Sequence, residues 1–544
     1  MNLWGNEIMN TTIYVYTRKV EKDSYPEGLA ESVHFAVAEE GKEKCPWNKN
    51  YGMLFAKAEI ADDNTIVPMG VRNPVIYKMY DGMIGVAAER IHEDGSLDET
   101  AEGKLLLWKT RDLVHFTEEA LVEKEEIEKY DPKDSLTVDS SLVEAAASFW
   151  NPIKFSHVEV PEKIEAGELG DVQAEVYYSD GSVRKKNVKW DLSGVDLSDP
   201  GEYEISGCVE QLSYKFPLSK GYGDPVIFPW EGKWYFISTN DNLHDIGIYV
   251  READDVAGLF ADDVVMHLIL PFDPGRKLEQ TFWAPEFHVI GGELYILFAV
   301  SGHEWGPQCH LMKKKKGANI IEEDSWENPI PVVKQDGSPL AGKGAITLDM
   351  TYFKTSRASY VSWSYREKMG TPQDTGSMVV IATIDESEPW RLTSEPVVLT
   401  RPLYGWENVS GTINNEGPNA FQKDGKVYVA YSGGAANGYT YTLGLLTADE
   451  DADLLNIESW TKATAPILDF YSVEGEYGSG HNSFFVNDDG ELMFSYHAET
   501  TMSDHLRCDG IRRVHFRKDG SPYFKMAIED DVVKEEVKTK LIIF

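Results

Sequence analysis

Four carboxylates and one histidine recur at the same place in five similar segments of the sequence. Asp224, Asp349 and Glu416 each precede a short apolar run, and Glu286 and His481 do so in two further segments. Each segment continues as a polar turn and an alternating strand, and successive segments are roughly 60–70 residues apart. Carboxyl groups that converge from different strands suit the hydrolysis of a glycosidic bond, because one must hold a proton while another stays ionised.

The residue types suggest how the three acidic groups would divide this work. Asp224 lies between a Gly-Tyr-Gly segment and a proline, an open strand start that suits a general base facing a water molecule. Glu416 has the longer side chain, which can reach a glycosidic oxygen as the general acid. Asp349 lies inside an apolar run, so we expect it beside Glu416, orienting that group and favouring its protonated form. Asp-Pro and Glu-Gly-Pro also occur in plain turns, and it is the recurrence of the acids that favours catalysis.

Two more polar residues occupy the equivalent position in the other segments. Glu286 ends the segment Trp283–Glu286, and we expect Trp283 and Glu286 to contact the substrate, with support of the cleft as the alternative for Glu286. His481 would enter the centre of the ring, where it would contact substrate or, through water, a metal ion. A hydrogen-bonded core histidine is the alternative for His481.

Aromatic and basic side chains near these segments are candidates for binding a sugar. Trp305, Trp406 and Tyr477 would stack on sugar rings, as aromatic faces do in carbohydrate clefts. Arg513 would pair with the general acid. Core packing explains the aromatic residues equally well, and a position on a surface strand explains the arginine.

The repeated segments predict an all-β protein with a five-bladed β-propeller over residues 215–544. No long stretch has the 3.6-residue period of an amphipathic helix. In a propeller the innermost strands surround one axis, so the polar residues at their starts would converge at one end of the channel. The last residues, 532–544, would supply a strand that closes the ring or packs on the N-terminal region.

Two other β-rich regions precede the propeller. Residues 1–150 contain alternating runs, and Asn73 there stands where Asp224 stands in a similar segment, so this unit would be blade-like without a catalytic group. Residues 151–214 hold short strands between turns, which is typical of a small β-sandwich. Through the turn at 178–182, the strand at 188–191 and the hairpin at 199–207, this region resembles the bacterial immunoglobulin-like domains of group 4.

The composition excludes several classes of function. The 544 residues carry a formal net charge of −39, which argues against nucleic acid as a partner. No stretch approaches the ~18–20 apolar residues that span a bilayer, so no membrane partner is expected. The start of the sequence lacks the basic and apolar segments of a signal peptide, which indicates a cytoplasmic protein. The four cysteines lack the spacing of a zinc site.

In combination, the motifs resemble glycoside hydrolase family 43 over residues 215–530. The resemblance rests on Gly223-Asp224-Pro225, Trp283-Ala284-Pro285-Glu286, Leu348-Asp349-Met350, Asn415-Glu416-Gly417-Pro418 and Gly480-His481-Asn482, in the order typical of the family. It implies a five-bladed propeller and an inverting hydrolase. On this chain, Asp224 looks like the general base, Glu416 the general acid and Asp349 the residue that tunes the acid.

The same resemblance implies a substrate class. Members of the family act mainly on α-L-arabinofuranosides and β-D-xylosides, so we expect release of terminal sugars of these two kinds from plant-derived oligosaccharides. The exo preference is a hypothesis based on the absent signal peptide and the additional domains. No cofactor is required, but His481 is similar to a family histidine that faces a calcium ion or waters in the channel.

Several alternatives stay open at the level of the sequence. A galactosidase or an arabinanase of the same family would share the motifs, and an invertase-like fructosidase would share the propeller. A carbohydrate-binding propeller without catalysis is the alternative from another class, although a pure binder needs no trio of converging acids. The oligosaccharide is the expected partner, and the sequence does not indicate an oligomeric state.

Overall fold

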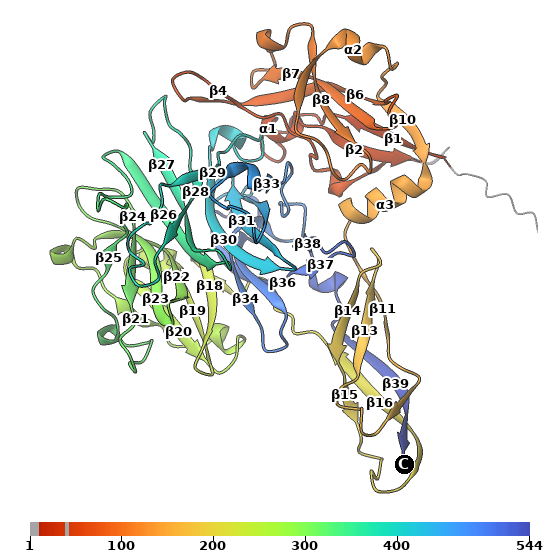
Figure 1. The fold of residues 1–544 in the computed structure, drawn as a ribbon, viewed down its shortest axis with the longest axis vertical. Helices are drawn as coiled ribbons and strands as arrows, with labels where there is room; N and C mark the ends of the chain where they lie inside the picture. Colours follow the sequence, from red (N-terminus) through yellow and green to blue (C-terminus); the bar gives the residue numbers. More distant parts are fainter. Residues whose placement is uncertain (1–9, 39–42) are drawn as a thin grey trace, which may run out of the picture.

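The computed structural model describes residues 10–38 and 43–544 and is essentially all-β (Figure 1). A ring of sheets lies on one side, the N-terminal sheets pack beside it, and an elongated sandwich that holds the C-terminus extends below. The longest helix in the described chain, α3 (Ser140–Trp150), has 11 residues and leads from the N-terminal sheets to the sandwich. None of the described helices is long and apolar enough to cross a membrane.

Five four-stranded antiparallel sheets in the described chain form the predicted β-propeller. The first four blades use strands that are consecutive in sequence. The first two are β18 (Tyr222–Trp230), β19 (Lys233–Asn240), β20 (Ile248–Ala253), β21 (His267–Leu270) and β22 (Gln280–Ile290), β23 (Glu293–Ser301), β24 (Gln308–Lys313), β25 (Ile330–Pro331). The next two are β26 (Ala345–Lys354), β27 (Ser359–Glu367), β28 (Met378–Ile384), β29 (Val397–Thr400) and β30 (Asn415–Lys423), β31 (Lys426–Gly433), β32 (Thr442–Asp449), β33 (Thr461–Lys462).

The fifth blade closes the ring with a strand from the other end of the domain. It contains β34 (Tyr477–Val486), β35 (Leu492–Glu499), β36 (Cys508–Arg513) and β17 (Ser219–Lys220). β17 comes directly before the first blade in sequence and pairs with β36 of the last blade. This pairing joins the two ends of the ring and covers an edge that would otherwise be open to association.

The N-terminal region contains two four-stranded sheets and a short hairpin. The sheets are β10 (Ser135–Asp139), β1 (Asn10–Tyr16), β2 (His34–Ala38), β3 (Cys45–Pro46) and β6 (Met69–Lys78), β7 (Ile84–His92), β8 (Lys104–Thr110), β9 (Ala120–Glu123). The hairpin is β4 (Glu59–Ile60) and β5 (Ile66–Val67), and the short helices are α1 (Glu27–Ala30) and α2 (Lys124–Glu128). Phe35, Trp47 and Trp108 belong to the apolar core that the two sheets share.

The N-terminal region packs on the propeller through a cluster of aromatic residues. Tyr25 and Tyr51 are buried against Phe470, with ring centroids 6.2 Å and 5.5 Å from the Phe470 ring. Trp406 lies in the same core at 0% exposure, and its indole N–H donates to the carbonyl of Thr464. The prediction that Trp406 stacks on a sugar is therefore wrong, because its large apolar surface is used to join the two regions.

The sandwich combines residues from the middle of the sequence with the last strand of the chain. Its sheets are β11 (Phe155–Glu159), β13 (Gln173–Tyr178), β14 (Val183–Asn187) and β12 (Lys163–Glu165), β39 (Lys534–Ile543), β16 (Gly201–Glu210), β15 (Lys189–Asp191). β39 pairs with β16 from Gly201↔Ile543 to Glu210↔Lys534 and lies parallel to β12.

The position of β39 corrects the expectation that the C-terminal residues close the propeller or pack on the N-terminal region. Val537, Leu541 and Ile543 alternate with exposed or half-buried residues and are buried in the sandwich. Without β39, both β12 and β16 would have an unpaired edge. A sandwich of this size also has little core of its own, so the chain end completes it.

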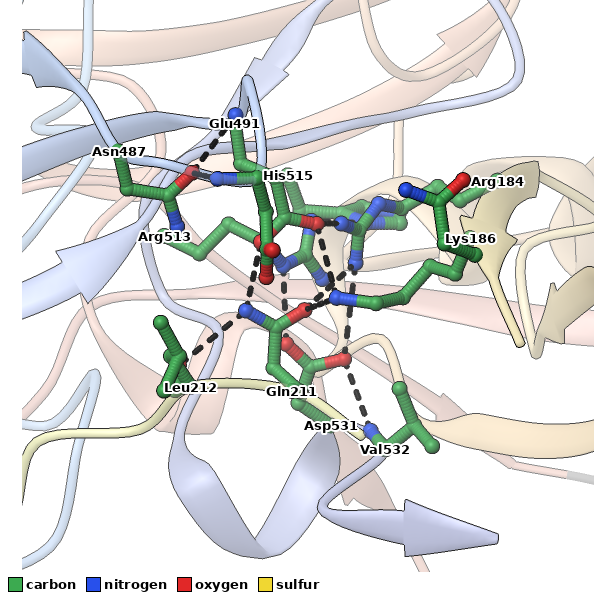
Figure 2. A network of polar contacts seen from close by, with 12 residues as sticks. Arg184, Lys186, Gln211, Leu212, Asn487, Glu491, Arg513, His515, Asp531 and Val532 are labelled. Carbon is green, nitrogen blue, oxygen red and sulfur yellow. Dashed lines mark hydrogen bonds and ion pairs between the residues drawn. The ribbon is translucent and has the colours of Figure 1, made fainter. Parts of the chain in front are cut away.

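A polar network joins the sandwich to the fifth blade (Figure 2). Arg513 is 4% exposed, and its Nε donates to Asp531 Oδ2 at 2.9 Å. Arg184 and Lys186 of the sandwich both bind Glu491 of the propeller. The prediction that Arg513 pairs with the general acid is wrong: its guanidinium holds the domain junction, where a planar fork suits a buried carboxylate.

Candidate active site

A β-bulge near the start of each innermost propeller strand presents residues of every blade to the same end of the channel. The strand register shifts at Gly223/Val226, Trp283/Glu286, Leu348/Thr351, Glu416/Asn419 and Gly480/Ser483. The first bulged residues have left-handed φ values, 58° at Asp224, 43° at Ala284, 56° at Asp349, 58° at Gly417 and 43° at His481. Because a bulge re-aims a side chain out of the regular alternation, these segments converge on the channel mouth.

The converging residues line a cleft of about 560 Å³. The lining residues are Asp224, Asp241, Asp245, Trp283, Leu348, Asp349, Glu416, Ala436, Asn437, His481, His505 and Arg507. The structure thus brings together the three acidic residues, the tryptophan and the histidine that the sequence grouped as one site.

Asp224 is held as a carboxylate by the residues around it. Its Oδ1 lies 3.0 Å from Arg507 Nη1 and 3.0 Å from His481 Nδ1. Its Oδ2 accepts a hydrogen bond from Thr239 Oγ1 at 2.5 Å. Burial alone would raise the pKa of Asp224, but the charges of Arg507 and His481 hold it well below its usual range. At neutral pH, Asp224 is therefore an ionised group able to accept a hydrogen bond from water.

Asp349 lies in the same cleft, but its surroundings favour the protonated form of its carboxyl group. It is 1% exposed, and its Oδ2 accepts hydrogen bonds from Ser364 Oγ at 2.7 Å and from the Gly417 N–H at 3.1 Å. Burial raises the pKa of Asp349 to about 7, and the carboxylates of Glu416 and Asp224 add to the rise, against the influence of His481. The bond to Gly417 also fixes the backbone directly beside Glu416.

Replacing Asp349 with asparagine is expected to stabilise the fold more at pH 8 than at pH 5. The pKa of Asp349 is about 7 in the folded protein, whereas an unfolded aspartate has a pKa of about 3.9. The folded state therefore binds the proton more tightly, and the wild type loses stability as the pH rises between these two values. Asparagine does not titrate and avoids this loss.

Thermal unfolding at pH 5 and pH 8 measures the effect. The Tm of Asp349→Asn minus that of the wild type should grow by several degrees from pH 5 to pH 8. The same change at the exposed Asp62 is the control and should show no such growth. An equal Tm difference at both pH values would show that Asp349 is ionised throughout.

Glu416 lies directly before the bulge of the fourth blade and is half-buried. Its Oε1 accepts a hydrogen bond from the hydroxyl of Tyr441 at 2.8 Å. Within the described part of the chain, Oε2 has no hydrogen-bond partner. One carboxyl oxygen is therefore fixed and the other is available to the cleft.

The predicted aromatic residues divide between the cleft and the core. Trp283 lines the cleft, and its indole N–H donates to Asp245 Oδ2 at 2.9 Å. Trp305 lies outside the lining and stacks on His310, with ring centroids 5.8 Å apart. Tyr477 packs against the aromatic core beside the N-terminal region. The prediction of sugar stacking at Trp305 is wrong, because its ring packs on the apolar core of the first two blades.

Glu286 supports the channel and is not part of the cleft lining. It is 4% exposed, and its Oε2 accepts hydrogen bonds from His288 Nε2 at 2.7 Å and Asn419 Nδ2 at 3.2 Å. The prediction of substrate contact at Glu286 is therefore wrong, and the alternative of structural support describes it. The reason is the bulge, which leaves Glu286 two residues after Ala284, inside the regular strand pairing.

His481 offers a single free nitrogen to the channel. Its Nδ1 faces Asp224, and its buried Nε2 has no hydrogen-bond partner in the described structure. Among residues 10–38 and 43–544, no group of three or more His, Cys, Asp or Glu side chains could hold a metal ion. The described side chains therefore offer no such cluster, and a contact from His481 to a metal ion through water stays a prediction.

Arg507, Asp241 and Asp245 are functional candidates that the sequence motifs did not reveal. Arg507 binds Asp241 through Nε at 3.0 Å and through Nη2 at 2.5 Å, in addition to its contact with Asp224. Asp245 and Arg507 lie in loops and Asp241 begins a short 3₁₀ helix, all outside the strand starts that repeat. The sequence signal for them was weak: Asp241 and Asp245 follow β19. This strand pairs with β18, which carries Asp224.

Two parts of the chain match known families. Residues 270–522 match "Glycosyl hydrolases family 43", and residues 173–212 match "Bacterial Ig-like domain (group 4)". The first match spans blades two to five, so the blade that carries Asp224 precedes it. The second lies within the sandwich.

Proteins of known description are similar to part of the chain. An extracellular exo-α-(1→5)-L-arabinofuranosidase of Streptomyces avermitilis is 28% identical over 331 residues, which cover 59% of this chain and 65% of that protein. One of the same description from Streptomyces chartreusis is 29% identical over 52% of this chain and 82% of that protein. The crystal structure of an α-L-arabinofuranosidase from Lactobacillus brevis matches with a TM-score of 0.50 and 27% identity, over 57% of this chain and 96% of that one.

These relatives are longer than the matched part of this chain, and their descriptions correct the predicted location of the protein. The chain spans 65% of the length of the Streptomyces avermitilis protein. The expectation of a cytoplasmic protein is contradicted, because both Streptomyces relatives are described as extracellular. That expectation depended on the first residues of the sequence, and residues 1–9 lie outside the described structure. A leader that has been cleaved off leaves no mark on the fold.

Proposed function

We propose that the cleft of this propeller, whose residues 270–522 match glycosyl hydrolase family 43, releases terminal α-L-arabinofuranosyl residues from oligosaccharides by hydrolysis with inversion. The observation that carries the proposal is the convergence of Asp224, Asp349 and Glu416 in one cleft, where the pKa of Asp224 is lowered and that of Asp349 is raised. Inverting hydrolysis needs such a set, since a base and an acid act at the same time on opposite sides of the sugar.

In this proposal Asp224 is the general base. Its low pKa keeps it ionised, and Arg507 and His481 hold the carboxylate in one orientation. Asp224 would take a proton from the attacking water as the water oxygen bonds to the anomeric carbon. The left-handed backbone at Asp224, with φ of 58°, is a strained conformation that aims this side chain into the cleft.

Glu416 is the general acid, and Asp349 assists it. Glu416 would give its proton to the glycosidic oxygen as the bond to the anomeric carbon breaks, and the bonding electrons stay on the leaving oxygen. Asp349 accepts the N–H of Gly417, so it holds the backbone on which Glu416 stands. Its negative charge, when present, favours the protonated form of a neighbouring carboxyl group.

The choice of sugar and of chain-end action is supported by the relatives. The two Streptomyces proteins are described as exo-α-(1→5)-L-arabinofuranosidases, and the Lactobacillus brevis structure is an α-L-arabinofuranosidase. We therefore place arabinofuranosides ahead of β-D-xylosides as substrates. The proposed steps use only side chains of the chain and a water molecule, and no cofactor takes part in them.

The test is turnover of p-nitrophenyl α-L-arabinofuranoside beside p-nitrophenyl β-D-xyloside, with and without EDTA. We expect the arabinofuranoside to be the better substrate and EDTA to change the rate little. Proton NMR of the first product should show the anomer opposite to that of the substrate. On α-1,5-arabino-oligosaccharides, arabinose alone should be released first; mid-chain products would point to an arabinanase, and no turnover of any glycoside would refute the proposal.

A further inference from the structure

Tyr441 makes the direct contact to the proposed general acid. Its hydroxyl donates to Glu416 Oε1 at 2.8 Å, and the side chain is 0% exposed. We propose that Tyr441 is a positioning residue that fixes Glu416 so that Oε2 carries the proton delivered to the leaving sugar. This inference rests on the proposed function and adds a residue that no repeated motif contains.

The ring of Tyr441 is held between two fixed neighbours. It stacks on His497, with centroids 5.3 Å apart and planes at 3° to each other. On another side it lies so close to Gly480 that a Cβ there would be 2.3 Å from its Cδ1. Only glycine permits this approach, so the phenol cannot shift without moving the innermost strand of the fifth blade.

His497 in turn connects Tyr441 to the proposed base. Its Nδ1 accepts the N–H of Asp224 at 3.2 Å, and its Nε2 donates to the carbonyl of Ala436 at 3.1 Å. These two bonds suit a neutral imidazole, and burial lowers the pKa of His497. The bulge that carries Asp224 and the loop that leads to Tyr441 are thus joined through one rigid ring.

The chemical consequence concerns the leaving group. When Glu416 loses its proton, the hydrogen bond from Tyr441 becomes charge-assisted and therefore stronger. The bond is worth more in the transition state than in the ground state, which is the condition for accelerating the reaction. Its benefit is largest for a sugar leaving group, which needs the proton, and small for a leaving group that departs as a stable anion.

The test is Tyr441→Phe, which removes the hydroxyl and keeps the ring. For arabinobiose, kcat/KM should fall by about 10- to 100-fold, the range for one hydrogen bond to a charged group. For 2,4-dinitrophenyl α-L-arabinofuranoside, whose leaving group needs no proton, it should fall by less than about 3-fold. The ratio of the two rates is measured on one sample, so a partly unfolded preparation does not change it.

Tyr431→Phe is the matched control, because Tyr431 is equally buried and donates to Glu407 Oε1 at 2.8 Å, outside the cleft lining. It should leave the ratio of the two rates unchanged. Equal losses on both substrates for Tyr441→Phe, or no loss on either, would overturn the positioning role while leaving the proposed function intact. A wild-type protein inactive on both substrates would overturn the proposed function and this inference with it.

Discussion

Asp224→Asn will reduce kcat/KM by about 10³-fold or more on every glycoside that the wild type hydrolyses, because general-base catalysis contributes up to about 10⁴-fold. An amide keeps the shape of the side chain and can still accept the hydrogen bond from Thr239, but it cannot take a proton from water. Because the base acts on the attacking water, the loss should be the same for arabinobiose and for the dinitrophenyl substrate.

The variant should remain folded, which circular dichroism and the Tm would verify. Arg507 keeps its two hydrogen bonds to Asp241 when the charge of Asp224 is removed. A modest fall in Tm is expected, since a buried arginine loses one of its carboxylates. Turnover that survives Asp224→Asn would mean that another group activates the water.

The N-terminal region offers a matched control for this variant. Asn73 occupies a bulge like that of Asp224, with φ of 50° and a register shift between Arg72 and Val75. It is exposed and donates to Glu89 at 2.9 Å, in a sheet outside the propeller ring. Adding Asn73→Asp to Asp224→Asn should therefore restore no activity, although the acidic sequence pattern is restored.

Glu416→Gln is expected to separate substrates according to their leaving groups. Glutamine can accept the hydrogen bond of Tyr441 but has no proton to give. For arabinobiose, kcat/KM should fall by about 10²- to 10⁴-fold, the range for general-acid catalysis. For the dinitrophenyl substrate the fall should be much smaller, since its leaving group departs without protonation.

Steady-state rates on both substrates measure this separation. Glu407→Gln is a suitable control, because Glu407 is fully buried in the same blade region but binds Tyr431 and Lys462 away from the cleft. Glu407→Gln should lower the Tm but leave the ratio of the rates on the two substrates unchanged. An equal loss on both substrates for Glu416→Gln would assign Glu416 to binding or structure instead of proton donation.

The sequence carried strong information wherever a short segment decides its own geometry. A polar residue before an apolar run, as in Gly223-Asp224-Pro225 or Glu416-Gly417-Pro418, marks a strand start in five segments, which predicts five blades. Propeller geometry then requires their polar residues to meet, and Asp224, Asp349, Glu416, Trp283 and His481 do line one cleft.

Contacts between segments that are distant in sequence could not be predicted from these local patterns. Arg507 pairs with Asp224 across 283 residues of sequence, and Tyr441, directly before β32 of the same blade, reaches Glu416 at the start of β30. Trp406 and Arg513 have residue types suited to sugar and carboxylate binding, but tertiary packing buries them at domain junctions. Residue type indicates what a side chain can bind, and only the fold decides what it meets.

By itself, then, the sequence determined the all-β class, the blade repeat and the acidic centre of the site, because these follow from local backbone preferences repeated five times. The tertiary structure alone decided that β17 closes the ring, that β39 completes the sandwich, and which loops supply Arg507 and Tyr441. These choices depend on burying unpaired strand edges and pairing buried charges, and both involve partners that lie far away in sequence.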